Sequence, residues 1–140
     1  MSSSPDRTGN PPIRHFTDLR VWQRAYELGL QVFEVSRRWP VEERFALTDQ
    51  VRRSARSVSA CIAEAWGKRR YEAHFVSKLT DADTELLETE NWLMFARAHQ
   101  YLPPEGFDSL YSLMREIGPG LGAMMRNPSP FIIAADHGGH

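Results

Sequence analysis

The chain has 140 residues, enough for one domain with a substantial core, and its formal net charge of −1 excludes a uniformly basic or acidic protein. Its single cysteine excludes a disulfide framework and a cysteine-based zinc site. No apolar run approaches the roughly 18 residues of a membrane span, and the first residues lack the apolar core of a signal peptide, so we expect a soluble cytoplasmic protein.

The charge is unevenly distributed along the chain. Residues 1–70 hold 13 Lys and Arg against 8 Asp and Glu, whereas residues 71–140 hold 4 against 10. A chain with two oppositely charged halves can pair them with each other, pair with a copy of itself, or present a basic face to an anionic partner.

Residues 1–15 are predicted to form a disordered arm, because Ser, Pro, Gly, Asn and charged residues dominate the N-terminus. A first helix is predicted over about residues 18–39, with Thr17 or Asp18 as its N-cap. Its apolar residues form two stripes that together span about 200°, whereas one docked face needs about 100°. The excess indicates a second buried surface, most simply a subunit interface. The stripes are Leu19, Trp22, Tyr26, Gly29 and Phe33, and Val21, Ala25, Leu28, Val32, Val35 and Trp39.

Pro40 ends the first helix, because the residue before a proline avoids the helical region. A second helix is predicted from Glu42 to Gly67, with acidic residues in its first turn and the glycine as its C-cap. Small residues fill its middle, and they allow a neighbouring helix to approach closely. Among them is Cys61, which we expect to be a buried hydrophobe.

A third, acidic helix is predicted over about residues 72–99 and a fourth over about residues 105–125. Pro119, between two glycines, is expected to kink or split the fourth helix. The tail, residues 126–140, carries an apolar cluster at Phe131, Ile132 and Ile133 that could dock on the bundle or on a neighbour. Four helices with three short connections predict an all-α, antiparallel up-down-up-down four-helix bundle over residues 16–125.

Three segments carry a family resemblance: FTDLRVWQRAYEL, PVEERFALTDQVRRSARSVSACIAEAWGKRR and ETENWLMFARAHQYL. Together they resemble the small bacterial proteins of the 23S rRNA intervening-sequence (S23) family, to which the accessory protein of diversity-generating retroelements is related. The resemblance implies a homopentamer of bundles around a central channel, and in the retroelement branch a barrel that binds nucleic acid and a reverse transcriptase through basic residues. The chain departs from the family where it has Cys61 for Asn, Ala65 for Gly, Thr84-Glu85 for Gly-Ser, and Gln100 for Gly.

The strongest candidate site is a basic cluster at the two ends of the segment from Val51 to Arg70. Arginines spaced three and four apart project from neighbouring positions on one helix, and guanidinium groups suit bidentate contacts with phosphate. The alternative is that the first three pair with Asp81, Asp83, Glu85 or Glu88 of the third helix, or across a subunit interface. The cluster consists of Arg52, Arg53, Arg56, Lys68, Arg69 and Arg70.

Enzyme and metal signatures are weak. Reading each histidine back three residues never gives the Glu-x-x-His motif of di-iron bundles, and His137 and His140 close a tail that we expect to fray. Glu85-x-x-Glu88 followed by Glu105-x-x-Asp108 resembles the magnesium motifs of all-α nucleotide pyrophosphohydrolases. In an antiparallel hairpin those two pairs stay well over ~10 Å apart, too far to share an ion. We therefore expect no catalytic residue, no cofactor and no metal.

The residues thus predict a non-enzymatic, self-associating bundle that binds RNA or another nucleic acid, or a protein that processes it, through its basic surface. The alternative is a structural or protein-partner scaffold whose arginines pair with its own acidic helix. The two readings differ in whether the arginines are already neutralised within the fold.

Overall fold

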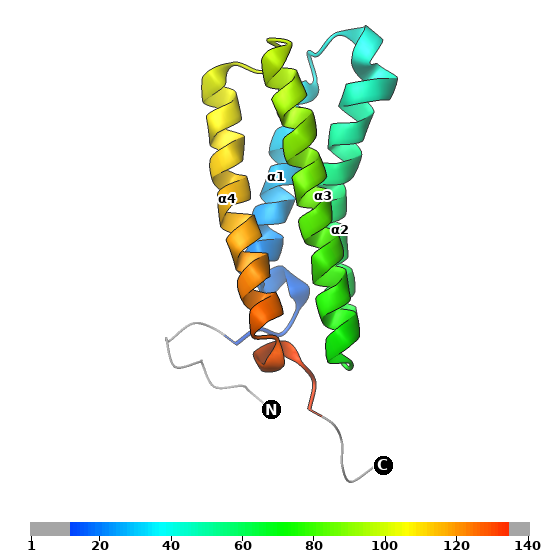
Figure 1. Ribbon diagram of the computed structural model, residues 1–140, viewed down its shortest axis with the longest axis vertical. Coiled ribbons are helices and arrows are strands. Elements are labelled where there is room, and N and C mark those ends of the chain that lie inside the picture. The colour runs from blue at the N-terminus through cyan, green and yellow to red at the C-terminus, as the bar shows by residue number, and fades with distance from the viewer. Residues whose placement is uncertain (1–11, 135–140) are drawn as a thin grey trace.

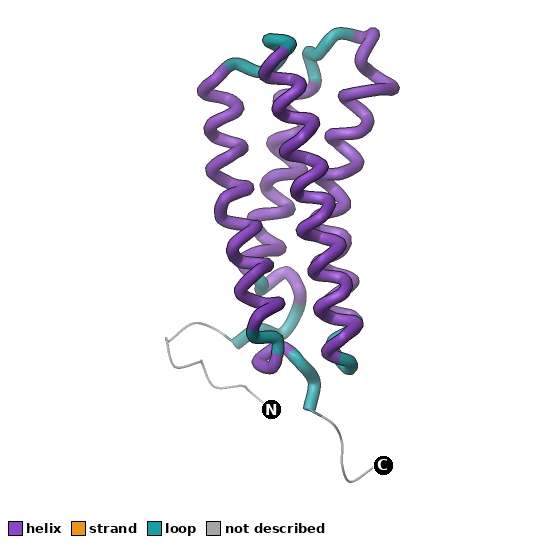
Figure 2. Tube along the Cα trace, in the orientation of Figure 1, coloured by secondary structure: helices purple, strands orange, loops and turns teal. Residues whose placement is uncertain are grey.

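The structure is a computed structural model that describes residues 12–134. Four long helices make up the domain: α1 (Arg20–Ser36), α2 (Asp49–Gly67), α3 (Glu72–Ala98) and α4 (Pro104–Arg126). They lie side by side, and the α1–α2 and α3–α4 connections meet at one end of the bundle while the α2–α3 connection lies at the other (Figure 1). Within residues 12–134 every regular element is helical (Figure 2), which confirms the all-α prediction with four helices. None of these helices combines the length and the apolar character that a membrane span requires.

The first helix begins later than predicted. A short 3-10 helix, η1 (Phe16–Asp18), precedes it, and α1 starts after Leu19, whose side chain makes no capping bond. The Asp18 carboxylate instead accepts the backbone N–H groups of Arg14 and His15 at 2.9 and 3.0 Å, and these bonds lower its pKa. The predicted N-cap residue Asp18 is therefore the third residue of the 3-10 turn, in a capping box with His15 as the N-cap. Residues 1–11 of the predicted arm lie outside the described residues.

The start of the second helix was predicted wrongly. Pro40 is followed by a 3-10 turn, η2 (Val41–Glu43), and by a π-helical turn, η3 (Arg44–Thr48), before α2 begins at Asp49. The helical periodicity of the sequence continues through these turns, so their different hydrogen bonding leaves no trace in the apolar pattern.

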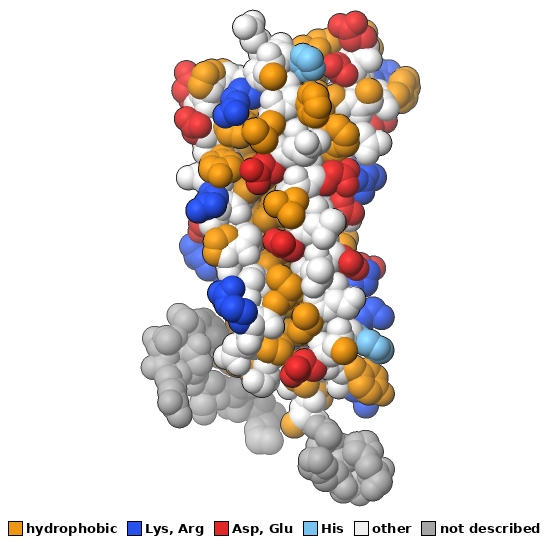
Figure 3. Space-filling model, in the orientation of Figure 1, with side chains coloured by type: hydrophobic (Ala, Val, Ile, Leu, Met, Phe, Trp, Pro, Cys, Tyr) orange, Lys and Arg blue, Asp and Glu red, His pale blue; other side chains and the backbone are white. Residues whose placement is uncertain are grey.

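The core is formed by one stripe from each helix. Of the two apolar stripes of α1, the one that contains Val21, Leu28 and Val32 is buried, whereas the other leaves Tyr26 half exposed. A buried hydrogen bond joins α2 to α3, where the Thr89 hydroxyl donates to Ser54 Oγ at 2.8 Å. On the face that α3 and α4 present, hydrophobic side chains lie along the seam between the helices, with charged side chains at its margins (Figure 3).

The fourth helix continues through Pro119 as one element, so the predicted split does not occur. Proline removes one backbone hydrogen bond, but the fully buried Ile117 and Leu121 anchor the helix on both sides of it. Beyond α4, a 3-10 turn, η4 (Ser129–Phe131), returns to the bundle, where Phe131 stacks on Phe75 with 5.9 Å between ring centroids. The Ile133 N–H donates to the Arg69 carbonyl at 3.1 Å, so the apolar cluster of the tail docks on its own chain.

One departure from the family pattern, Gln100 in place of glycine, lies at the end of α3. Gln100 has a φ of 64°, and the N–H groups of Gln100 and Tyr101 close a Schellman motif on the carbonyls of Arg97 and Ala96. This left-handed position favours glycine, the residue that family members are expected to carry here. A side chain at such a position costs about 1–2 kcal/mol.

We expect Gln100→Gly to raise the free energy of unfolding by about 0.5–1 kcal/mol, since relief of the left-handed strain outweighs the extra freedom of the unfolded chain. Urea unfolding followed by circular dichroism measures the change. Gln100→Ala is the control, because it shortens the side chain but keeps the Cβ atom, and it should give no gain. Equal stabilisation by both substitutions would show that the backbone conformation is not the cause.

Candidate nucleic-acid interface

Arg53 is the one member of the predicted cluster that α3 neutralises. Its guanidinium lies 3.3 Å from Glu85 and forms a close ion pair with Glu88. The Trp92 indole N–H donates to Glu88 at 3.0 Å, and this bond together with Arg53 lowers the pKa of the Glu88 carboxyl. Arg53 thus follows the alternative prediction, in which an arginine of the cluster pairs with carboxylates of the third helix. It links α2 to α3.

Arg52 and Arg56 turn the other way, toward α1. Both guanidinium groups lie over the Phe33 ring, with Cζ atoms 4.5 and 5.8 Å from its centroid, and Arg37 approaches the same ring at 5.8 Å. Arg52 Nε also donates to Ser36 Oγ at 2.8 Å. Neither Arg52 nor Arg56 forms an ion pair with a carboxylate of the described residues. Three guanidinium groups thus lie near one aromatic ring, and two of them, those of Arg52 and Arg56, have no carboxylate partner among the described residues.

A groove between α1 and α2 begins beside Arg56. It has a volume of about 510 Å³, and its walls combine the side chains of Tyr26, Leu30 and Phe33 with Ser59. Tyr26 stacks on Trp22 with ring centroids 4.9 Å apart, which extends the aromatic surface along α1. Exposed aromatic rings next to guanidinium groups are the combination on which unpaired nucleic-acid bases stack while their phosphates are bound.

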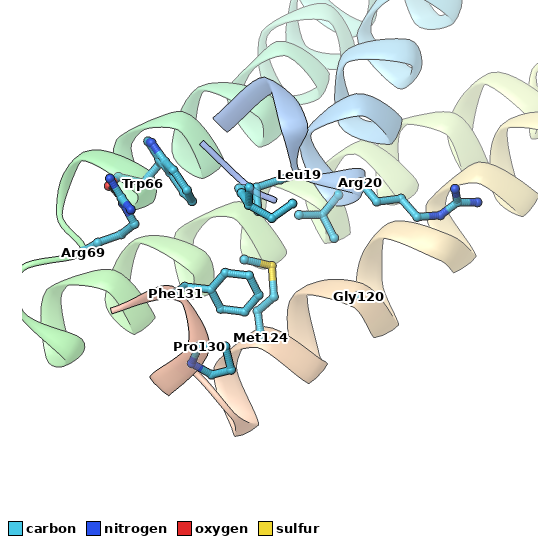
Figure 4. A pocket seen from close by; sticks show the side chains of 10 residues that line it. Leu19, Arg20, Trp66, Arg69, Gly120, Met124, Pro130 and Phe131 are labelled. Carbon is cyan, nitrogen blue, oxygen red and sulfur yellow. Dashed lines mark hydrogen bonds between the residues drawn. The ribbon is translucent and has the colours of Figure 1, made fainter. Parts of the chain in front are cut away.

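The second basic end lies beyond Gly67, where α2 stops. Arg69 folds back over Trp66, with Cζ 3.5 Å from the ring centroid and Nε donating to the Trp66 carbonyl at 2.7 Å. Burial lowers the pKa of this guanidinium. Figure 4 shows the pair at one side of an apolar cleft of about 520 Å³, opposite Phe131 and Met124. Lys68 and Arg70 are exposed and form no ion pair within the described part of the chain.

The six predicted residues therefore form two separate groups and not one site. Arg56 and Gly67 are eleven positions apart on α2, which corresponds to a rise of about 17 Å. The structure adds Phe33 and Arg37, which the prediction missed. Phe33 and Arg37, the C-cap of α1, are four residues apart and so lie on the same side of the last helical turn. This spacing was the signal that could have paired the aromatic ring with the arginines of the next helix.

The enzyme-like acidic motif is not assembled. Glu85 and Glu88 are engaged by Arg53, while Glu105 lies in the first turn of α4. No three His, Cys, Asp or Glu side chains between residues 12 and 134 come together in a way that would hold a metal ion. Cys61 is buried, and this burial raises the pKa of its thiol, which disfavours the reactive thiolate.

Comparisons with known proteins place this geometry in a family. The sequence model described as "23S rRNA-intervening sequence protein" matches residues 17–123. A crystal structure of a protein of unknown function from the S23 ribosomal protein family of Bacteroides thetaiotaomicron VPI-5482 is similar, with a TM-score of 0.69 and 27% sequence identity. The similarity covers 76% of this chain and 96% of the other. No curated protein matches the chain.

Proposed function

Since the chain belongs to the 23S rRNA-intervening sequence protein family, as its three segments predicted, we propose that it is a non-enzymatic, oligomeric bundle that binds RNA. The RNA would contact Arg52 and Arg56 beside Phe33, which we call the α1–α2 surface. The observation that carries this proposal is the arrangement of Arg52 and Arg56 around Phe33. Both guanidinium groups lack a carboxylate partner among the described residues, and their Cζ atoms lie 4.5 and 5.8 Å from the centroid of the Phe33 ring. The phosphates of the RNA would meet the guanidinium groups of Arg52 and Arg56.

The oligomeric part of the proposal rests on apolar side chains of α1 that the bundle leaves uncovered. Tyr26 and Leu30 are 50% and 54% exposed, and they lie beside the stacked Trp22. Apolar side chains gathered in this way on one face are typical of a subunit interface. The family resemblance favours five copies of an antiparallel bundle, and a ring of copies would repeat the basic surface and multiply weak phosphate contacts.

The alternative function is a structural or protein-partner scaffold. The pairing of Arg53 with Glu85 and Glu88 favours it, because this part of the basic cluster serves the fold itself. It accounts less well for Lys68 and Arg70, which extend into solvent beyond α2 without such partners among the described residues.

We expect the double substitution Arg52→Gln and Arg56→Gln to weaken binding of single-stranded RNA about tenfold or more at moderate salt. The slope of log Kobs against log salt should become shallower by about 1.4, since two phosphate contacts are lost at about 0.7 each. Fluorescence anisotropy with a labelled oligoribonucleotide, titrated at several salt concentrations, measures both quantities.

The matched control is Arg115→Gln with Arg126→Gln, which removes the same charge from the exposed side chains of α4. This variant should keep most of the affinity, and sedimentation of each variant should show an unchanged assembly. The mass of the unmutated protein, expected near five times 16.1 kDa, tests the pentamer in the same samples. Equal losses from the two double variants would rule out the α1–α2 surface, and absence of binding at low salt would favour the scaffold.

A further inference from the structure

A smaller cavity than the two described above lies at the corner where α1 is followed by η2 and η3. Its volume is about 300 Å³, and none of the residues that line it carries a carboxylate. The lining residues that concern us are Ser36, Arg37, Trp39, Arg44, Thr48 and Arg52. We refer to it as the basic cavity.

Three guanidinium groups give the basic cavity its charge. Arg44 and Arg52 form no ion pair with the described residues. Arg37 has one carboxylate partner, Glu34, at 3.5 Å, but both side chains are more than 60% exposed, so solvent screens this pair strongly. The nearest acidic residue along the chain before Arg44 is Glu43, whose carboxylate accepts the Tyr101 hydroxyl at 2.9 Å. The cavity wall therefore carries excess positive charge.

Trp39 provides an independent sign of a ligand. Only 8% of this residue is exposed, and its indole Nε1 is buried without a hydrogen-bond acceptor among the described residues. Buried donors are almost always satisfied, because an unmade hydrogen bond is costly away from water. A ligand that brings acceptor oxygens to the wall of this cavity would supply the missing partner.

The local backbone explains why these groups converge. The π-helical turn η3 begins at Arg44 and ends at Thr48, and both residues line the cavity. Such turns are rare and occur frequently at functional sites. From α1, Ser36 Oγ accepts the Arg52 Nε–H at 2.8 Å and thereby holds this guanidinium at the cavity wall. The end of α1, the π-helical turn and the first turn of α2 thus contribute side chains to one space.

We propose that the basic cavity binds a dianionic phosphoryl group, either free phosphate or the terminal phosphate of a larger ligand. Guanidinium groups bind phosphate oxygens in a bidentate manner. Thr48 and Trp39 also line the cavity, and a phosphate oxygen that reaches the Trp39 indole N–H would give it an acceptor. The cavity leaves room for the first part of a group attached to the phosphate. The cavity shares Arg52 with the proposed RNA contact, but it has no lining residue in common with the α1–α2 groove and does not require that the groove bind RNA.

The test is a titration of isotope-labelled protein with inorganic phosphate at constant ionic strength, with chloride as the reference. The Trp39 indole resonance, assigned by its loss in Trp39→Phe, should shift with saturation and by more than the indole resonances of Trp22, Trp66 and Trp92. Calorimetry with the same ligand should show a phosphate affinity at least tenfold weaker in Arg44→Gln and several-fold weaker in Trp39→Phe.

Arg38→Gln is the matched control, because Arg38 is exposed, adjacent in sequence and absent from the cavity lining, and this variant should bind phosphate as the unmutated protein does. A shift that never saturates, or equal weakening in Arg38→Gln and Arg44→Gln, would overturn the proposal. Oligoribonucleotides with a 5′-phosphate or a 5′-hydroxyl distinguish the two sources of the ligand. A preference for the phosphorylated form that Arg44→Gln removes supports a terminal phosphate, and competition by inorganic phosphate alone supports the free anion.

Discussion

Phe75→Ala is expected to lower the free energy of unfolding by about 3–5 kcal/mol. Phe75 is fully buried near the start of α3, where its ring stacks on Phe131 of the docked C-terminal segment. Truncation removes most of a large apolar side chain from the core and leaves a cavity that two packed helices cannot easily fill. It also removes the surface on which Phe131 rests, so the segment after α4 should lose protection as well.

Urea unfolding followed by far-ultraviolet circular dichroism measures this loss, with protein concentrations matched because assembly contributes to stability. Phe45→Ala is the control, since it makes the same chemical change at a side chain that is 83% exposed, and it should alter the free energy by no more than about 0.5 kcal/mol. Hydrogen exchange at the Ile133 amide, which bonds to the Arg69 carbonyl, reports on the docked segment. Similar effects of the two substitutions would contradict the assignment of Phe75 to the core.

Gly120→Ala is expected to destabilise the bundle, although alanine is the better helix former by about 1 kcal/mol. A Cβ atom at Gly120 would lie 2.6 Å from Cγ1 of Val21 in α1, closer than such atoms approach. Val21 is nearly buried and β-branched, so its side chain has little freedom to move away. Overpacking of this kind costs about 1–3 kcal/mol and outweighs the gain in helix propensity.

The control for this substitution lies two residues further along α4. At Gly122 a Cβ atom would meet only the end of the flexible Arg126 side chain, at 3.1 Å, so Gly122→Ala should stabilise the protein by up to about 1 kcal/mol. Adding Val21→Ala to Gly120→Ala should restore part of the lost stability, and thermal unfolding of the four variants gives the coupling between the two sites. Additive effects of Val21→Ala and Gly120→Ala would show that α1 and α4 are not in close contact at this point.

The periodicity of the sequence predicted the helices well where apolar residues alternate with a clear polar face. The middle of α2 and both ends of α4 follow from that pattern, because each needs only one face to be buried. The pattern is weaker in α3, where Leu87, Met94 and Phe95 are exposed. Sequence also identified the family, whose model matches residues 17–123 and so includes the three segments that carry the resemblance almost entirely. The backbone conformation of Gln100 could not be predicted from the sequence around it, because it depends on how the chain turns from α3 toward α4.

The tertiary structure alone decided what becomes of the basic cluster. In the sequence Arg52, Arg53 and Arg56 are equivalent, but their directions around the helix axis differ, so that α3 neutralises one while α1 offers the others an aromatic ring. The basic cavity likewise exists only because a π-helical turn and the end of α1 meet in space. The charge and the periodicity of a helix can be determined from its own sequence. Whether its arginines are neutralised, and whether its side chains enclose a cavity, depends on which neighbouring helix each of its faces contacts.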